Sequence, residues 1–154
     1  MTQTTGAKSF CAAIVEYNTS GTTWTVMQGF LAAVAVSGGD RNTGEAYTTD
    51  GDTPIVRAGK RTPLEVTVRY VYTEGATDPF EILRTQYETD CGGQANIRWS
   101  VGGTSTDFLF TVETTDLASH LVAFGYPQGE AEAGEPIVNE FMVRTQKIIK
   151  GVVA

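Results

Sequence analysis

Side chains that could hold a metal ion are few and lie far apart in this chain. There is one histidine, His120, and the two cysteines, Cys11 and Cys91, are separated by 80 positions. Zinc sites place their ligands at short, regular spacings, and none of those spacings occurs here. The sequence therefore predicts no metal site and no cofactor. With only two cysteines, it also predicts free thiols rather than a disulfide framework.

Covalent catalysis would need a nucleophile held beside a base. Ser119 precedes His120, but no pattern marks a partner for either residue. The glycine-rich segment GGDRNTG at 38–44 lacks the lysine of a phosphate-binding loop. Asp50 and Asp52 have the spacing of part of a calcium loop, without its terminal bidentate acid. No motif selects two of the 18 acidic residues as a glycosidase pair. We predict that the chain is not an enzyme, and a hydrolase is the remote alternative.

Two tryptophans, Trp24 and Trp99, could stack on bases or sugars. Aromatic residues in strands more often pack into a core, because each buries a large apolar area. We expect both tryptophans in the core, and we expect His120 to be a half-buried structural residue.

Composition limits the classes of function. A chain of 154 residues predicts one domain, residues 1–154. A net charge of −7 opposes affinity for nucleic acid, although a conduit should repel the phosphates of passing DNA. The same acidity is common in proteins that simply stay in solution. No apolar run approaches the length of a membrane span, and MTQTTGAKSF lacks a signal peptide's features, so we expect neither membrane insertion nor secretory export.

The clearest structural pattern is a long alternating strand followed by a helix. Between 64 and 73, apolar and polar residues alternate, which predicts one buried and one polar face. The residues predicted to face inward are Leu64, Val66, Val68, Tyr70 and Tyr72. Next come Asp78 as N-cap, Pro79 at the first helical position and Glu81 at the capping-box position. The helical spacing of Phe80, Leu83 and Tyr87 gives this helix a side that can pack on a sheet.

The rest of the chain reads as strands and turns. The further predicted strands are Ser9–Tyr17, Thr23–Met27, Phe30–Val36, Ala95–Val101, Phe108–Glu113, His120–Phe124 and Ile137–Ile149. The segment FLAAVAV at 30–36 is almost entirely apolar, so both of its faces should be covered. The long segment 37–62 either forms a hairpin, with Glu45–Thr49 pairing Pro54–Ala58, or is ordered only by a partner. We predict an all-β fold with one helix, an antiparallel β-sandwich or open barrel.

The order of loop, strand and helix segments along the chain also resembles that of a known family. A Gly/Asp/Thr-rich loop leads into TPIVRAGKRTPLEVTVRYVYTE, then TDPFEILRTQY, and EPIVNEFMVRTQKIIKG follows near the end. This order is similar to that of the major tail tube proteins of long non-contractile-tailed (siphovirus-type) bacteriophages. The resemblance is clearest from about 37 to 87. It implies a structural virion protein whose hexameric rings stack into the tail tube through which phage DNA passes into the host.

The resemblance also implies partners and a location. The expected partners are other copies of the chain, the tail tip and terminator proteins, and DNA that passes without specific binding. The expected location is the virion tail, assembled in the host cytoplasm. The N-terminal arm at about 1–8, the loop at about 37–62 and the C-terminal end are then the elements expected to bridge successive rings.

An assembling sheet leaves edges that the next copy can pair, and a closed ring removes them. Acids predicted to face the channel are Glu65, Asp107 and Glu113. Residues predicted to contact other subunits are Asp50, Asp52, Arg57, Lys60, Arg61, Glu130 and Glu132. Three alternatives remain open: the tube protein of a contractile injection or secretion system, a monomeric β-barrel that binds a small molecule, and a capsid-decorating protein.

Overall fold

Strand β6 (Leu64–Val71) forms where the alternating pattern predicts it. The side chains of Val66, Val68 and Tyr70 are fully buried, whereas Arg69 is exposed on the opposite face. The computed structural model describes residues 3–20, 22–89, 93–114 and 119–154. Within these ranges the fold is mostly antiparallel β-sheet with one α-helix, as the sequence predicts.

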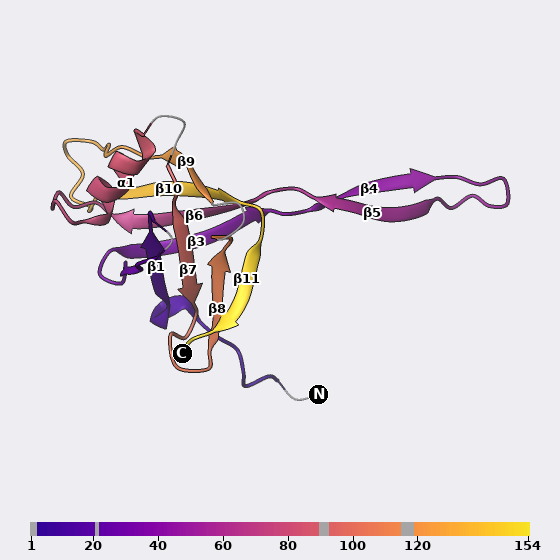
Figure 1. Ribbon diagram of the computed structural model, residues 1–154, viewed down its shortest axis with the longest axis horizontal. Helices are drawn as coiled ribbons and strands as arrows, with labels where there is room; N and C mark the ends of the chain where they lie inside the picture. The colour runs from indigo at the N-terminus through magenta and orange to yellow at the C-terminus, as the bar shows by residue number, and fades with distance from the viewer. Residues whose placement is uncertain (1–2, 21, 90–92, 115–118) are drawn as a thin grey trace.

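Two sheets face each other, and a separate hairpin extends from one of them (Figure 1). The five-stranded sheet has the order β11-β8-β7-β1-β2 and the four-stranded sheet has the order β3-β6-β10-β9. The remaining strand bounds are β1 (Ile14–Asn18), β2 (Thr25–Val26), β3 (Leu31–Gly38), β4 (Arg41–Ala46), β5 (Ile55–Arg61), β7 (Asn96–Ser100), β8 (Phe108–Val112), β9 (His120–Phe124), β10 (Val138–Thr145) and β11 (Ile148–Val152). A short 3-10 helix, η1 (Phe10–Ala12), precedes β1.

The core fills the space between the two sheets. The five-stranded sheet contributes Val15, Tyr17, Ile97, Trp99 and Val112, and the four-stranded sheet contributes Val66, Val68, Tyr70, Leu121, Phe141 and Val143. Trp99 is in the core as predicted. Trp24, which was also expected in the core, is only partly buried. The guanidinium carbon of Arg98 lies 4.5 Å from the centre of the Trp24 ring.

Helix α1 (Pro79–Tyr87) has the predicted bounds and packs against β9. Leu83 is fully buried, and the ring of Tyr87 stacks on Phe124 with centroids 5.7 Å apart. Asp78 is the N-cap residue by position, but its carboxylate makes no cap hydrogen bond. It accepts hydrogen bonds from the Thr73 hydroxyl at 2.6 Å and from the Gly75 backbone N–H at 2.9 Å. The carboxylate therefore stabilises the turn before the helix.

The final predicted strand, Ile137–Ile149, is wrong as a single element. It is divided into β10 and β11, which belong to different sheets. The backbone N–H of Glu113 donates to the Lys147 carbonyl oxygen at 3.1 Å, so the chain has changed sheets by this point. The two strands share an apolar, β-branched composition, and composition alone does not reveal such a change.

The predicted faces of two other strands also need correction. The predicted strand Ser9–Tyr17 begins only at Ile14, and Val15 and Tyr17 are its most buried apolar residues. In β3 the side chain of Val36 is 46% exposed, so the expectation that both faces are covered fails for a single chain. This strand is a sheet edge, and only one side of it has a neighbour.

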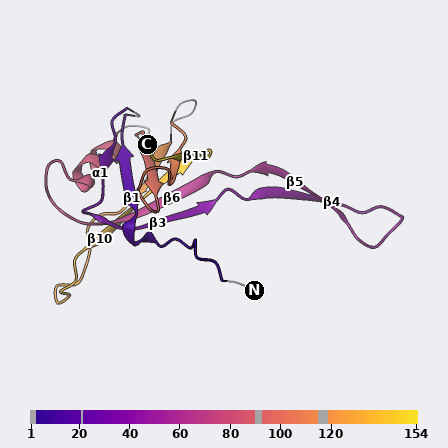
Figure 2. The same cartoon turned by 90° about the horizontal axis from the view of Figure 1, so that it is seen from below.

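The segment 37–62 forms a hairpin, one of its two predicted states, but the paired strands are Arg41–Ala46 and Ile55–Arg61 instead of the predicted Glu45–Thr49 and Pro54–Ala58. β4 pairs with β5 in the register Glu45↔Val56 and Ala46↔Ile55. Gly38 and Gly39 have positive φ angles of 75° and 78° where β3 enters the hairpin, a conformation that glycine adopts without strain. The hairpin projects well away from both sheets, and a second view shows the same (Figure 2).

Candidate assembly surfaces

The outward face of the four-stranded sheet carries balanced charge. Because Val66 and Val68 point into the core, Glu65 and Arg69 point outward. On β10, Arg144 lies opposite Glu65 and forms an ion pair with it, while Glu140 lies opposite Arg69. Small residues of β3, including Ala33 and Ala35, occupy the same face by register. The result is a flat wall on which each of these acids has a basic residue opposite it.

The three acids predicted to share one wall do not lie together. Glu65 is on the four-stranded sheet, whereas Asp107 and Glu113 belong to the five-stranded sheet, at the turn before β8 and at its end. Glu113 is only 2% exposed, and its carboxylate lies 3.3 Å from the Lys147 ammonium. A buried, paired carboxylate cannot face a channel in this conformation. The sequence pattern could not separate the two sheets.

Asp107 organises the turn between β7 and β8. It accepts hydrogen bonds from the hydroxyl and the backbone N–H of Thr104, and it lies 3.5 Å from the Lys8 ammonium. The bonds from Thr104 hold the pKa of the Asp107 carboxyl below its ordinary value, with a smaller contribution from Lys8. Through Lys8 this residue also ties the N-terminal arm to the sandwich.

Strand β3 presents an open edge of the four-stranded sheet. The Tyr72 N–H donates to the Ile137 carbonyl oxygen at 2.8 Å, so Val66 and Val68, which lie opposite Val36 and Val34, direct their backbone groups to β10 and not to β3. Antiparallel pairs alternate between bonded and non-bonded sites. The backbone groups of Val34 and Val36 therefore point away from β6, toward the open edge. At the other margin of the sheet, segment 93–95 covers only the start of β9, where the Leu121 N–H donates to the Gly93 carbonyl oxygen.

The hairpin has a basic shaft and an acidic tip. The basic cluster of Arg57, Lys60 and Arg61 lies on β5, and Asp50 and Asp52 lie in the connection at the far end. Apolar side chains gather near the same tip, and they include Tyr47, Ile55 and Val56, each at least half exposed. The sequence marks the charged residues, but it gives no signal for the exposure of these apolar ones, because Ile55 and Val56 are consecutive and show no alternation.

Glu130 and Glu132 lie in the exposed connection between β9 and β10. With Glu135 this connection borders a cavity of about 750 Å³ that also includes Arg69. Among the described residues, none of the ion pairs joins the basic cluster to these acids or to the acids of the hairpin tip. Within one chain, the basic cluster is therefore not paired with either group of acids.

A cluster of five aromatic side chains that sequence analysis did not identify joins α1 to β9. Its members are Tyr72, Phe80, Tyr87, Phe124 and Tyr126. The Phe80 ring centre lies 4.9 Å from that of Tyr72 and 5.4 Å from that of Phe124, distances typical of favourable aromatic pairs. The cluster fixes the helix beside the margin of the four-stranded sheet.

Features of a catalytic or metal site are sparse in the part of the chain that the structure describes. His120 is exposed on β9 opposite Arg144, so its predicted half-burial is wrong. Cys11 is an exposed free thiol in η1, while Cys91 lies outside the described residues. The described residues hold no group of three or more potential metal ligands. No helix within those same ranges has the length and apolar character needed to cross a membrane.

The arrangement of two facing sheets, a helix at one sheet margin and a projecting hairpin defines a known class of fold, that of tail-tube proteins. A chain of the sheath–tube complex of an extracellular contractile injection system (PVC) superposes with a TM-score of 0.70 at 17% identity, over 97% of this chain and 94% of that chain. A chain of the anti-feeding prophage baseplate superposes with a TM-score of 0.71 at 10% identity, over 98% and 99%. A chain of the tail of a gene transfer agent particle gives 0.66 at 11% identity, over 96% and 100%.

These likenesses establish the fold. The similar chains come from structures of a tube, a baseplate and a tail of contractile injection systems and phage-like particles. No protein-family model matches the sequence, and no curated protein matches it either.

Proposed function

We propose that this chain is the subunit of a self-assembling tube. Copies join edge to edge through the four-stranded sheet to form a ring, and the rings stack. The observation that carries the proposal is strand β3, an apolar edge whose backbone groups at Val34 and Val36 point away from β6 and toward none of the other strands that the structure describes. Such an edge favours aggregation unless another strand pairs with it.

Six copies are the proposed ring size. Two of the similar structures carry six-fold symmetry in their descriptions. Six four-stranded sheets would make a closed barrel of 24 strands. With strands about 4.8 Å apart and tilted as in other barrels, such a ring would be on the order of 40 Å across between backbones. That width leaves a channel wide enough for a DNA duplex or an extended polypeptide.

The proposed channel wall is the outward face of the four-stranded sheet. Glu65 lies on this face, next to Arg144, and Arg69 lies opposite Glu140. A wall of paired charges gives a passing polyanion few unpaired cations to bind, so DNA could move along it without being held. Asp107 and Glu113 have no place on this wall.

Contacts between rings are proposed for the hairpin and the two ends of the chain. The basic cluster would meet the acids Glu130 and Glu132 of another copy, because opposite charges on exposed segments of two molecules attract. The ends of the tube would contact tail tip and terminator proteins. The particle would assemble in the host cytoplasm, with the chain located in the tail.

Two kinds of tube are candidates. The siphovirus-type tail tube is the family that the sequence resembles. The contractile-system tube is supported by the four similar structures that come from such systems. Binding of the assembled tube to a sheath protein would distinguish them, because only the contractile type carries a sheath.

The proposal is tested with the purified chain at increasing concentration. Sedimentation and negative-stain microscopy should show rings or hollow tubes above a threshold concentration. A chain that stays near 16.5 kDa at every concentration would reject the tube and favour a monomeric binding protein.

A further inference from the structure

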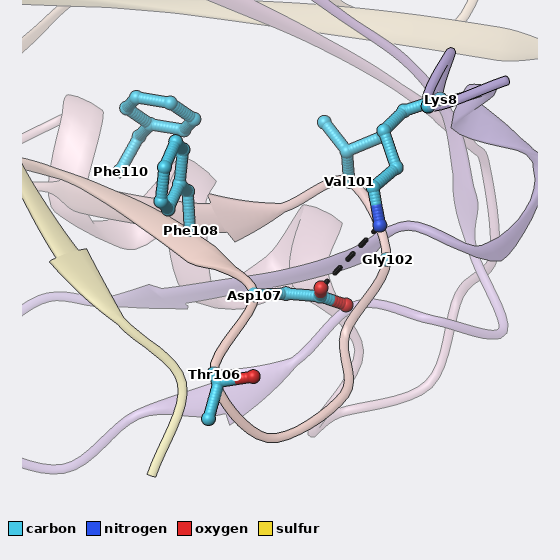
Figure 3. Close-up of a pocket in the computed structure, with 8 residues that line it drawn as sticks. Lys8, Val101, Gly102, Thr106, Asp107, Phe108 and Phe110 are labelled. Carbon is cyan, nitrogen blue, oxygen red and sulfur yellow. Dashed lines mark hydrogen bonds and ion pairs between the residues drawn. The ribbon is translucent and has the colours of Figure 1, made fainter.

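A pocket lies between the N-terminal arm and the turn that joins β7 to β8 (Figure 3). Its volume is about 340 Å³, and its lining residues include Val101, Phe108 and Phe110. Phe108 is 55% exposed, although it is a large apolar side chain in a strand. The Lys150 ammonium lies 4.0 Å from the centre of the Phe108 ring, and Lys8 forms another part of the lining. The pocket is therefore apolar inside and has two lysines at its margin.

The tip of the hairpin has the complementary character. Tyr47 is 68% exposed, and Ile55 and Val56 beside it are also largely exposed. Asp50 and Asp52 follow Tyr47 in the connection between the two strands. An apolar group flanked by carboxylates can enter an apolar pocket flanked by ammonium groups, because both the apolar burial and the charge attraction are then favourable.

We propose that the hairpin tip of one copy docks in this pocket of another copy, with Tyr47 entering beside Phe108 and with Asp50 or Asp52 meeting Lys150 or Lys8. This inference rests on the proposed tube function and names the surface that receives the hairpin. The N-terminal arm then has a defined role, since Gly6 and Lys8 supply one wall of the pocket.

A second copy is the occupant because the hairpin does not reach its own pocket. It extends away from the sandwich in both views, while the pocket lies against the sandwich, between the N-terminal arm and the turn that joins β7 to β8 (Figures 1 and 2). About twelve residues on each side of the hairpin, each adding roughly 3.3 Å, give a reach of about 40 Å. That reach is enough to cross a neighbouring sandwich.

The charge of the tip also favours this pocket over the larger cavity beside the β9–β10 connection. The cavity beside the β9–β10 connection is bordered by Glu130 and Glu135. These carboxylates would repel Asp50 and Asp52. The pocket at Phe108 contains one carboxylate, Asp107, whose charge is already paired with Lys8.

The test is zero-length crosslinking of assembled wild-type protein. A carbodiimide joins a carboxylate to an amine as an amide, and the water that is lost converts the reagent to a urea. Unlabelled and 15N-labelled chains are mixed before assembly, so that mixed-isotope crosslinked peptides identify contacts between copies. We expect Asp50 or Asp52 joined to Lys8 or Lys150 in mixed-isotope pairs. Lys60 and Lys147, the other two lysines, are the internal controls.

Each outcome decides a different point. Tubes in which the tip acids are joined only to Lys60 or Lys147, or to no lysine, overturn this inference and leave the tube function standing. A chain that forms no tubes, as judged by microscopy of the same sample, overturns the tube function and this inference with it.

Substitutions provide an independent measurement. Tyr47→Ala and Phe108→Ala should each raise the threshold concentration for assembly by about tenfold, and together by less than the product, because they remove one contact. Val26→Ala is the matched control, since Val26 is similarly exposed but lies on β2, outside the pocket lining. Fully multiplicative effects of Tyr47→Ala and Phe108→Ala would overturn the pairing.

Discussion

Replacing Val36 with proline should prevent assembly and leave the sandwich folded. In β3, hydrogen bonding to β6 uses the odd-numbered residues, because the even-numbered residues of β6 bond to β10. The Val36 N–H points to the open edge, so proline there removes a donor that β6 does not use. Its ring would also obstruct an incoming strand. Ala35→Pro is the matched control, because the Ala35 N–H points toward Thr67 of β6.

The two substitutions differ in their expected energies. Val36 is about half exposed, so its replacement should lower the free energy of unfolding by about 1 kcal/mol, part of the value of a fully buried valine. Ala35→Pro leaves a carbonyl of the β3–β6 ladder without its donor, which costs about 1–3 kcal/mol in the folded chain. At the interface between copies, the larger cost falls on Val36→Pro. Val36→Pro leaves an acceptor of the next copy unpaired, for about 1–3 kcal/mol at each junction, and 1.4 kcal/mol is a factor of about ten in affinity.

Thermal unfolding and sedimentation together provide the assay. The Val36→Pro chain should melt within about 4 °C of wild type and remain unassembled at concentrations at least tenfold above the wild-type threshold. Ala35→Pro should melt at a lower temperature than Val36→Pro. Normal tubes from Val36→Pro at the wild-type threshold would refute the assignment of β3 as the joining edge.

Three further predictions concern the hairpin, its charges and the core. Replacing residues 41–61 with a two-residue Asn-Gly turn should preserve the melting temperature, because Asp40 and Thr62 are already joined by a 2.9 Å backbone hydrogen bond. The same replacement should abolish stacking, and normal tubes in the microscope would contradict this. Reversing the charges of the basic cluster should weaken assembly more at low salt than at high salt, and a salt-independent threshold would argue against an electrostatic contact. Burial raises the pKa of Tyr70 to about 12, above the ordinary 10.0. The neutral phenol therefore contributes fully to the free energy of unfolding below pH 10, and about 2–3 kcal/mol of that free energy is lost as pH rises from 10 to 12. Tyr70→Phe should remove this loss in urea unfolding, and equal pH slopes for both chains would be contrary to expectation.

Local patterns predicted the elements whose burial is decided within a few residues. The alternation in β6 identified its core face, and Pro79 together with the spacing of Phe80, Leu83 and Tyr87 located the helix and its first residue. Both signals follow from side-chain direction along a single element. They do not depend on which strand becomes the neighbour.

Features set by long-range pairing were not predictable in this way. Residues 137–143 alternate as one strand would, and the sequence does not show that β10 and β11 pair with β6 and β8 in different sheets. The acids Glu65 and Glu113 were grouped for the same reason, since only the pairing shows that one is outward and the other buried. The exposure of Val36 was not predicted, because an apolar side chain in a strand is expected to be buried against other residues. A single chain does not bury it.

The central claim is that the four-stranded sheet continues from one copy into the next. A cryo-electron microscopy map of the assembled protein, at a resolution that separates strands, tests it directly. The account predicts that backbone groups of β3 lie about 2.9 Å from those of a strand in the adjacent copy, with Arg69 and Glu140 facing the channel. A map in which β3 faces solvent, or in which that face of the sheet lies on the outside of the tube, would contradict the account.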